Sequence, residues 1–265
     1  MKTALVTGTT SGMGRQIALD LAVRGWRLLL PVRSPDQVGS LVCELRRVGS
    51  AEVILLQCDL SDPQQVRGLC ERVASLGELD LVINNAGVGG GTDHSRREEN
   101  ASGTELRMAV NAVAPHVIAQ CLAPRLRAGG RIVQVGSATQ AELPLDDLNF
   151  EASYDGFEAY MRSKLALLMS AIALGAQGVP VNVVHPATQM PTKMVREDGV
   201  PTLMSIDDGA IAVLRMALDS ELDGVCGQYF ERFERVDPPQ KQAEDAEARR
   251  AVVGWIEARS QIGPQ

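Results

Sequence analysis

Tyr160 and Lys164 are the two residues of this sequence best suited to proton transfer. They lie four positions apart in an apolar, proline-free run from Phe157 to about Gly178, so on a helix both side chains point the same way. A tyrosine ordinarily loses its proton near pH ~10. An ammonium about 4 Å away, at an effective dielectric constant of about 20, is worth roughly 4 kcal/mol. That would lower the pKa of the phenol by about three units, so that Tyr160 could donate or accept a proton near neutrality.

A glycine-rich loop near the N-terminus is a candidate phosphate site. The apolar run Thr3 to Val6 leads into Thr7-Gly8-Thr9-Thr10-Ser11-Gly12-Met13-Gly14, and an amphipathic segment follows from Gln16 to Arg24. In a strand, glycine loop and helix, the glycines let a pyrophosphate approach the backbone and the helix N-terminus favours its charge. A simple turn is the alternative interpretation. The predicted contacts in the loop are Gly8, Thr10, Ser11, Gly12, Met13 and Gly14.

The end of the second predicted strand, Trp26 to Val32, bears on the choice of cofactor. In dinucleotide folds an acidic residue at this place binds the ribose 2′-hydroxyl, whereas an arginine accommodates a 2′-phosphate. Arg33 follows the strand, and the nearest acid, Asp36, could serve NAD only if the loop doubled back. The sequence therefore predicts NADP(H) in preference to NAD(H), with a solvated surface arginine as the alternative.

Strands and helices alternate along the chain, which predicts an α/β fold with a parallel sheet covered by helices on both faces. We expect one domain over 1–265, a segment over a pocket at 187–205, and a C-terminal helix at 240–259. The pattern Ser102-x-x-Glu105 predicts a capping box at the start of a long helix, which Pro115 should kink.

Two polar residues stand out within these elements. Asn111 lies in the apolar stripe of the long helix, where an amide needs partners, so either a structural hydrogen bond or a proton relay fits. Ser137 follows the strand Arg131 to Val135, and ligands bind at the carboxyl ends of parallel strands. A serine in that place is otherwise an ordinary turn residue.

Composition limits the possible functions. The 265 residues are 45% hydrophobic and 22% charged, with a net charge of −7 and no basic block, which disfavours binding to nucleic acid or to an anionic membrane. The five widely spaced cysteines form no C-x-x-C pair and are expected to be reduced thiols of a cytoplasmic protein. We recognise no signal peptide, no membrane-spanning run and no metal-binding motif.

Taken together, these motifs resemble the short-chain dehydrogenase/reductase family. The resemblance covers nearly the whole chain and rests on Thr7-Gly8-x-x-x-Gly12-x-Gly14, Asn84-Asn85-Ala86-Gly87, Asn111, Ser137 and Tyr160-x-x-x-Lys164. Four further stretches are similar to the retinol-dehydrogenase-like branch and its bacterial relatives, which generally prefer NADP(H): Glu105-Leu106-Arg107, Asp146-Asp147-Leu148-Asn149, Ser163-Lys164-Leu165-Ala166 and His185-Pro186. The family implies a Rossmann-type sheet of seven parallel strands in the order 3-2-1-4-5-6-7.

The resemblance also implies a role for each catalytic position. Tyr160 would exchange the proton, Lys164 would lower its pKa and bind the nicotinamide ribose, Ser137 would hold the substrate oxygen, and Asn111 would order a water linking the lysine to solvent. The further cofactor contacts that it implies are Asp59 and Leu60 at the adenine, Asn85, Ala86 and Gly87 along the adenosine, and Pro186 and Thr188 at the nicotinamide. Pro186-Ala187 departs from the usual Pro-Gly.

The sequence thus predicts an oxidoreductase that transfers a hydride between NADP(H) and a carbonyl or alcohol substrate. Leu143, Met190, Met194 and Met204 suggest a partly apolar small molecule, and the alternative is that they belong to the core. Related enzymes often pair through the helices that carry Asn111 and Tyr160, which implies a homodimer or homotetramer. Two alternatives stay open: a non-catalytic NADP-binding sensor, and an epimerase or dehydratase that retains its cofactor.

Overall fold

The computed structural model describes residues 1–197 and 199–260. Its strands form one sheet in the order β3-β2-β1-β4-β5-β6-β7-β8. The strands are β1 (Thr3–Val6), β2 (Arg27–Val32), β3 (Glu52–Gln57), β4 (Leu79–Asn84), β5 (Leu126–Val135), β6 (Val181–His185), β7 (Tyr229–Glu231) and β8 (Glu234–Arg235). The pairings from β3 through β7 are all parallel, which confirms the predicted Rossmann-type order.

The strand β8 is an addition that the sequence did not predict. It pairs antiparallel with β7, and Glu231 lies opposite Glu234 across a two-residue turn. Arg232 in this turn has a φ of 55°, a conformation usually supplied by glycine or asparagine. The turn Arg232-Phe233 contains neither residue, so the sequence carries no hairpin signal at this place.

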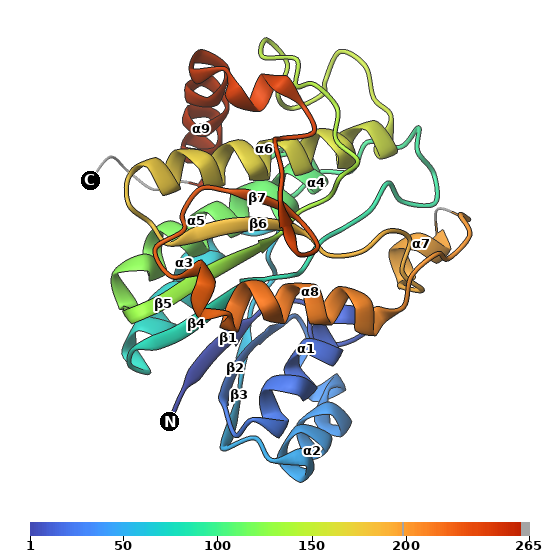
Figure 1. Cartoon of the computed structure of the whole chain (residues 1–265). Coiled ribbons are helices and arrows are strands. Elements are labelled where there is room, and N and C mark those ends of the chain that lie inside the picture. The colour runs from blue at the N-terminus through green and yellow to red at the C-terminus, as the bar shows by residue number, and fades with distance from the viewer. Residues whose placement is uncertain (198, 261–265) are drawn as a thin grey trace.

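Helices cover both faces of the sheet (Figure 1). On one face lie α1 (Gly12–Val23), α2 (Gly39–Val48) and α8 (Ile206–Leu218), and on the other lie α3 (Pro63–Ser75), α5 (Ala114–Leu122) and α6 (Gly156–Ala176). Apolar side chains fill a separate core between the sheet and each helical layer. The strands β1 and β4 are almost wholly apolar because helices bury both of their faces.

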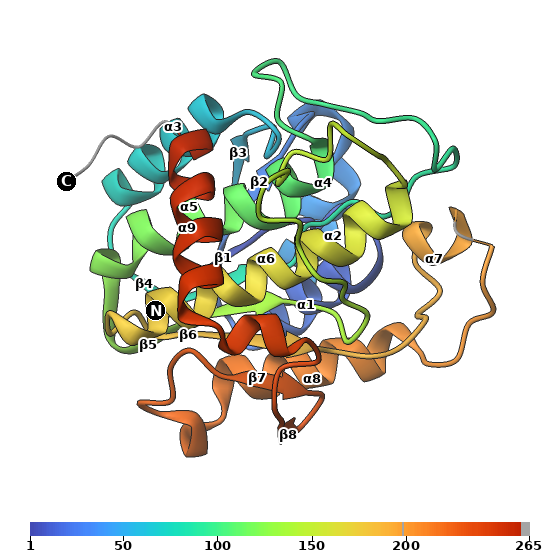
Figure 2. The ribbon, with the colours of Figure 1, turned by 90° about the horizontal axis from the view of Figure 1, so that it is seen from above.

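The remaining helices are short or peripheral. They are α4 (Leu106–Met108), α7 (Lys193–Glu197), α9 (Ala246–Ser260), and single turns at Pro35–Gln37, Ala123–Arg125, Ser220–Leu222 and Lys241–Glu244. The helix α9 crosses the outer side of α6 and also contacts α5 and α3 (Figure 2). Ala248, Val252 and Ile256 bury one of its faces there.

The long helix around Asn111 differs from the prediction at its cap, and it is irregular just ahead of Pro115, where a kink was predicted. Its N-cap is Glu105, whose carboxylate accepts the N–H of Met108 at 2.8 Å, so the predicted cap at Ser102 is wrong. The N–H of Ser102 instead donates to Asn100 in the preceding loop. Ahead of Pro115 the helix widens into a π-helical turn, Ala109–Val113, which accommodates a residue without an N–H group.

One stretch, Leu106–Arg125, is long and apolar enough to cross a membrane by length and composition alone. In this fold 78% of its most apolar window is buried. Its hydrophobic character is therefore accounted for by its place in the core, between the sheet and the helices α3, α6 and α9.

Candidate active site

The amine of Lys164 is the central group of the site. It lies in the middle of α6, a helix whose N-terminus is capped by the side chain of Asp155. Lys164 is only 4% exposed, and its Nζ donates to the carbonyl oxygen of Val135 at 2.9 Å, at the end of β5. Burial lowers the pKa of this amine to about 8.

Tyr160 shares this face of α6 with the lysine. The Lys164 Nζ lies 5.8 Å from the centre of the Tyr160 ring, so the predicted pair does come together. The Tyr160 ring is half-buried and stacks on Phe157 at a centroid distance of 6.2 Å. Phe157 in turn stacks on His94 at 6.3 Å. Aromatic contacts at the start of α6 therefore flank the phenol, and the sequence analysis had given neither Phe157 nor His94 a place near the site.

Asn111 joins the loop after β4 to the catalytic helix. Its Oδ1 accepts the N–H of Val88 at 2.9 Å, and its Nδ2 donates to the carbonyl oxygen of Val88 at 2.9 Å and to Ser163 Oγ at 3.0 Å. The Ser163 hydroxyl donates to the carbonyl oxygen of Tyr160 at 2.7 Å. A structural role for Asn111 is thus observed, and its role in ordering a water stays a prediction.

Ser137 lies immediately beyond β5 and is 6% exposed. Its Oγ accepts the N–H of Thr139 at 3.1 Å, which leaves the hydroxyl hydrogen as a donor. The carbonyl that holds Lys164 belongs to Val135, two residues earlier on the same strand. The end of β5 therefore carries both the candidate oxyanion donor and the anchor of the lysine.

The glycine loop has the geometry of an anion site. Gly8 and Gly12 have φ angles of 71° and 56°, and a Cβ on Gly14 would lie only 2.2 Å from the carbonyl oxygen of Gly8. The N-cap residue of α1, Ser11, makes no side-chain capping bond, and no acid lies in the first turn. The N–H groups and the positive end of this helix therefore face the loop without a competing carboxylate.

Side chains next to the glycines complete the loop. Thr10 and Ser11 are exposed, whereas the side chain of Met13 is buried in the core, so Met13 can offer a ligand only its backbone. Thr9 is fully buried, and its hydroxyl has no hydrogen-bond partner within the described ranges. Thr7 had been given no role of its own in the glycine-loop motif. Its hydroxyl accepts the N–H groups of both Asn85 and Ala86, at 3.0 and 2.9 Å.

Gly87 lies close beside the lysine. A Cβ at this exposed position would lie 3.3 Å from Asn111 Oδ1, 3.7 Å from Lys164 Nζ and 3.9 Å from the Cε of Met194. A Cβ on Gly12 would likewise lie 3.5 Å from the Cγ2 of Thr192. The segment with α7 therefore lies over both the glycine loop and the lysine. The glycine loop and the uncapped helix together fit a bound dinucleotide.

Arg33 lies at the end of β2 with an exposed side chain. No hydrogen bond or ion pair to its guanidinium is found in the part of the chain that the structure describes. Asp36 is also exposed and belongs to the turn Pro35–Gln37. The arginine is thus able to bind a phosphate without giving up an internal partner.

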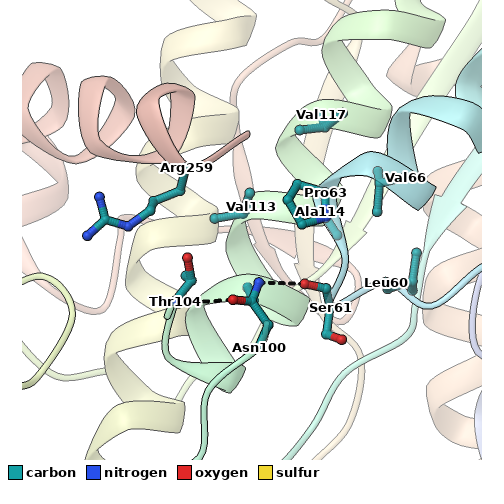
Figure 3. Close-up of a pocket in the computed structure, with 11 residues that line it drawn as sticks. Leu60, Ser61, Pro63, Val66, Asn100, Thr104, Val113, Ala114, Val117 and Arg259 are labelled. Carbon is teal, nitrogen blue, oxygen red and sulfur yellow. Dashed lines mark hydrogen bonds between the residues drawn. The ribbon is translucent and has the colours of Figure 1, made fainter. Parts of the chain in front are cut away.

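Asp59 and Leu60 lie where β3 leads into α3. The carboxylate of Asp59 accepts from the N–H and the hydroxyl of Ser61 at 2.9 and 2.8 Å. Leu60 lines a cavity of about 10 Å³, below which Asn100 binds both Ser61 and Thr104 (Figure 3). So small a space holds at most one water, so this cavity is not a substrate pocket.

The end of β6 brings a histidine near the lysine. Burial and the charge of Lys164 lower the pKa of His185 to about 4, so its ring is neutral at pH 7. Its Nε2 lies 3.1 Å from Thr188 Oγ1. Pro186 is buried, and Thr188 is exposed at the start of the segment that leads to α7. These residues are placed to meet a ligand that lies along the strand ends.

A buried arginine supports the loop after β4, and sequence reasoning missed this role. Arg107 is 2% exposed and donates to the carbonyl oxygens of Gly89 and Gly90, each at 2.9 Å, and to the hydroxyl of Tyr154 at 2.7 Å. Its ion pair with the buried Glu105 measures 3.3 Å. The stretch Glu105-Leu106-Arg107 had been noted only as a family likeness.

The described residues contain no group of three or more His, Cys, Asp or Glu side chains that could bind a metal ion.

Comparisons with known proteins agree with this arrangement. Residues 2–199 match the family model of the short chain dehydrogenases. Mouse polyprenol dehydrogenase is 32% identical over 97% of this chain and 82% of its own, and human retinol dehydrogenase 14 is 31% identical over 86% and 77%. A short chain dehydrogenase from Burkholderia cenocepacia, solved in complex with NADP, superposes with a TM-score of 0.66 at 27% identity, covering 87% of this chain and 95% of its own. This chain therefore belongs to the short-chain dehydrogenase/reductase family, in its retinol-dehydrogenase-like branch.

Proposed function

We propose that this chain, an NAD(P)-dependent oxidoreductase by family, reduces a ketone or aldehyde with NADPH and runs in reverse as an alcohol dehydrogenase. The observation that carries the proposal is the buried Lys164 amine, held by Val135 beside the ring of Tyr160 and close to Gly87. A pair of this kind lets a phenol exchange a proton near neutrality.

When bound, a nicotinamide cofactor supplies or accepts the hydride. In the direction of reduction the Tyr160 hydroxyl gives its proton to the substrate oxygen, and the product is an alcohol. The Ser137 hydroxyl donates a hydrogen bond to the same oxygen as its negative charge develops. Lys164 favours the phenolate that Tyr160 becomes, because an ammonium nearby stabilises the anion.

NADP(H) is the proposed cofactor, and NAD(H) is the less suited one. Arg33 offers an uncommitted guanidinium at the end of β2, where the 2′-phosphate of NADP would lie. Guanidinium and phosphate make strong charge-assisted hydrogen bonds. The solved relative from Burkholderia cenocepacia contains NADP, which supports the same choice.

The proposed substrate is a small, partly apolar alcohol or carbonyl compound. Leu145, Phe157 and Leu203 are large apolar side chains that expose 44%, 36% and 68% of their surface. They come from the loop after Ser137, from the start of α6 and from the segment before α8. Two relatives are named for their action on polyprenol and on retinol, which favours the same class of compound.

The cytoplasm is the proposed location, and a homodimer or homotetramer is the predicted assembly. The buried state of the helix Leu106–Arg125 and the free thiols at all five cysteines support the location. The helix α9 already packs on the outer side of α6 (Figure 2). Two copies of the chain that paired through α6 would therefore have to accommodate α9 in their interface. Light scattering on a sizing column measures the number of copies.

A fluorescence titration with NADPH and NADH, followed by turnover of aldehydes and ketones of increasing chain length, tests the proposal. We expect tighter binding of NADPH and oxidation of NADPH with the apolar members of the panel. Binding of NADPH without its oxidation across the panel would favour the non-catalytic sensor. Conversion of a substrate without net oxidation of NADPH would favour the epimerase or dehydratase.

A further inference from the structure

The loop that follows Ser137, residues 138–145, is held from a distant part of the chain. We call it the serine loop. It forms no helix or strand, yet Gln140 is 7% exposed and Leu143 is 3% exposed. Gln240 and Gln242, which bind its backbone, come from the turn before α9, about 100 positions later, and Arg162 of α6 also donates to the carbonyl oxygen of Glu142 at 3.1 Å. These bonds restrain the loop although it has no regular secondary structure.

Gln242 binds the backbone of Leu143 with both ends of its side-chain amide. The N–H of Leu143 donates to Gln242 Oε1 at 2.8 Å, and Gln242 Nε2 donates to the carbonyl oxygen of Leu143 at 2.9 Å. An amide that bonds through both atoms fixes the orientation of the peptide as well as its distance.

Gln240 extends the attachment to the serine itself. Its Nε2 donates to the carbonyl oxygen of Gln140 at 3.0 Å, and Gln140 Nε2 donates to the carbonyl oxygen of Ser137 at 2.8 Å. The Ser137 hydroxyl in turn accepts the N–H of Thr139. Side-chain amides therefore link the turn before α9, through Gln140, to the carbonyl oxygen of Ser137. The hydroxyl of the same serine is the candidate oxyanion donor.

The turn that carries these glutamines is itself firmly placed. Ala243 is fully buried, and its carbonyl oxygen accepts from Arg249 Nη1 at 2.6 Å. Val252 and Ile256, both fully buried, fix α9 against the helices below it. The attachment therefore connects the serine loop to a rigid element, and the loop cannot shift without breaking bonds to that element.

We propose that Gln240 and Gln242 are positioning residues, which hold the serine loop and thereby the Ser137 hydroxyl where the substrate oxygen is bound. The proposal rests on the proposed function, since it assigns Ser137 to that oxygen. Neither glutamine touches the reacting atoms, and both act through Gln140 and Leu143. A misplacement of about 1 Å at a reacting group can cost on the order of 10²-fold in rate.

The test compares Gln242→Met with the matched control Gln177→Met, which changes an exposed glutamine just after α6. We expect kcat with the best carbonyl substrate to fall roughly 10-fold or more in Gln242→Met, because the serine loop that follows Ser137 loses both of its bonds to Gln242. NADPH binding and the midpoint of thermal unfolding should stay close to those of the control. Gln242→Glu, which keeps the acceptor for Leu143 N–H and loses the donor, should recover part of kcat.

Amide hydrogen exchange followed by mass spectrometry gives a readout that does not depend on turnover. The peptides over 138–145 should exchange faster in Gln242→Met than in Gln177→Met, while those over 109–113 stay unchanged. Should Gln242→Met fail to fold, Gln240→Met removes a single bond and takes its place. Equal exchange in variant and control, or an unchanged kcat beside a lowered unfolding midpoint, would overturn the proposal. A wild-type chain without turnover would contradict the proposed function, and the exchange data would still decide whether the glutamines hold the loop.

Discussion

The two sides of the active site are built in opposite ways. On the inner side, Asn111 and Lys164 are 1% and 4% exposed, and the bonds to Val88, Ser163 and Val135 hold them in place. On the outer side, the described residues of 188–205 are exposed or half-buried, with Leu203 at 68%, and the N–H of Leu203 donates to the carbonyl oxygen of Gln189 across the segment. We propose from this difference that the inner side sets the proton chemistry and the outer side sets the choice of substrate.

The largest expected effect comes from the phenol on the inner side. Tyr160→Phe removes the proton donor, so kcat should fall by about 10²-fold or more. Binding of NADPH should change little, because the glycine loop and Arg33 are untouched. Steady-state kinetics together with a fluorescence titration measure both quantities. A variant that kept more than about a tenth of the activity would rule out general acid catalysis by this residue.

The buried amine gives a second, pH-dependent way to examine the inner side. The pKa of Lys164 is about 8 in the fold, against 10.5 for the free side chain. Between these values the unfolded chain binds more protons, so the free energy of unfolding should rise with pH. We expect this rise to be about 3 kcal/mol in the absence of cofactor, and to be absent in Lys164→Met.

Urea unfolding of both chains at intervals from pH 7 to pH 10.5 measures the effect. Taking the difference between the two chains removes the contribution of titrating groups that do not interact with Lys164. If the free energy of unfolding of the two chains changed in parallel over the whole pH range, the amine would be well solvated in the fold. The inner side would then be less rigid than we describe.

Arg33 tests whether cofactor choice belongs to the rigid part of the site. Arg33→Ala should weaken binding of NADPH by roughly 10-fold to 100-fold, because a charged hydrogen bond contributes about 1.5–3 kcal/mol. Binding of NADH, which lacks the 2′-phosphate, should be unaffected. Arg24→Ala, at another exposed arginine just after α1, serves as the control and should leave both affinities unchanged. Equal losses for NADPH and NADH would contradict the assignment.

The smallest expected effect compares a helix cap from each side. Asp155 caps α6 on the inner side, and Ser205 caps α8 where the outer segment ends. Replacing either with alanine should cost about 1 kcal/mol of stability. Only Ser205→Ala should also raise the KM of the substrate, because it loosens the end of the segment 188–205. Similar changes of KM in both variants would remove the distinction between the two sides.

Much of the fold could be predicted because parallel strands buried on both faces form apolar runs that end at polar residues. The ends of β1, β4 and β5 follow from that pattern, whereas the strand order was expected only from the family resemblance. The cap of the long helix was misassigned because Ser102-x-x-Glu105 fits a capping box locally, whereas burial made Glu105 itself the cap. Local patterns do not show which residue the core will enclose.

Within the site, contacts inside one helix were predictable and contacts between elements were not. Tyr160 and Lys164 share a helix, so their spacing fixed their relative direction. The carbonyl oxygen of Val135 as the partner of the amine depends on how α6 packs against β5, and no local pattern encodes that. The attachment of Leu143 by Gln242 joins positions about 100 residues apart and left no signal in the sequence.

The π-helical turn at Ala109–Val113 has a consequence for how this helix could be altered. An α-helix turns about 100° per residue, so the wider turn rotates everything before it relative to α5. Deleting one residue there would restore a regular ladder but swing Arg107 away from the loop carbonyls that it binds. The π-helical turn therefore fixes the angle between α5 and the residues before it. We expect an insertion or deletion in this turn to be tolerated far less well than a substitution there.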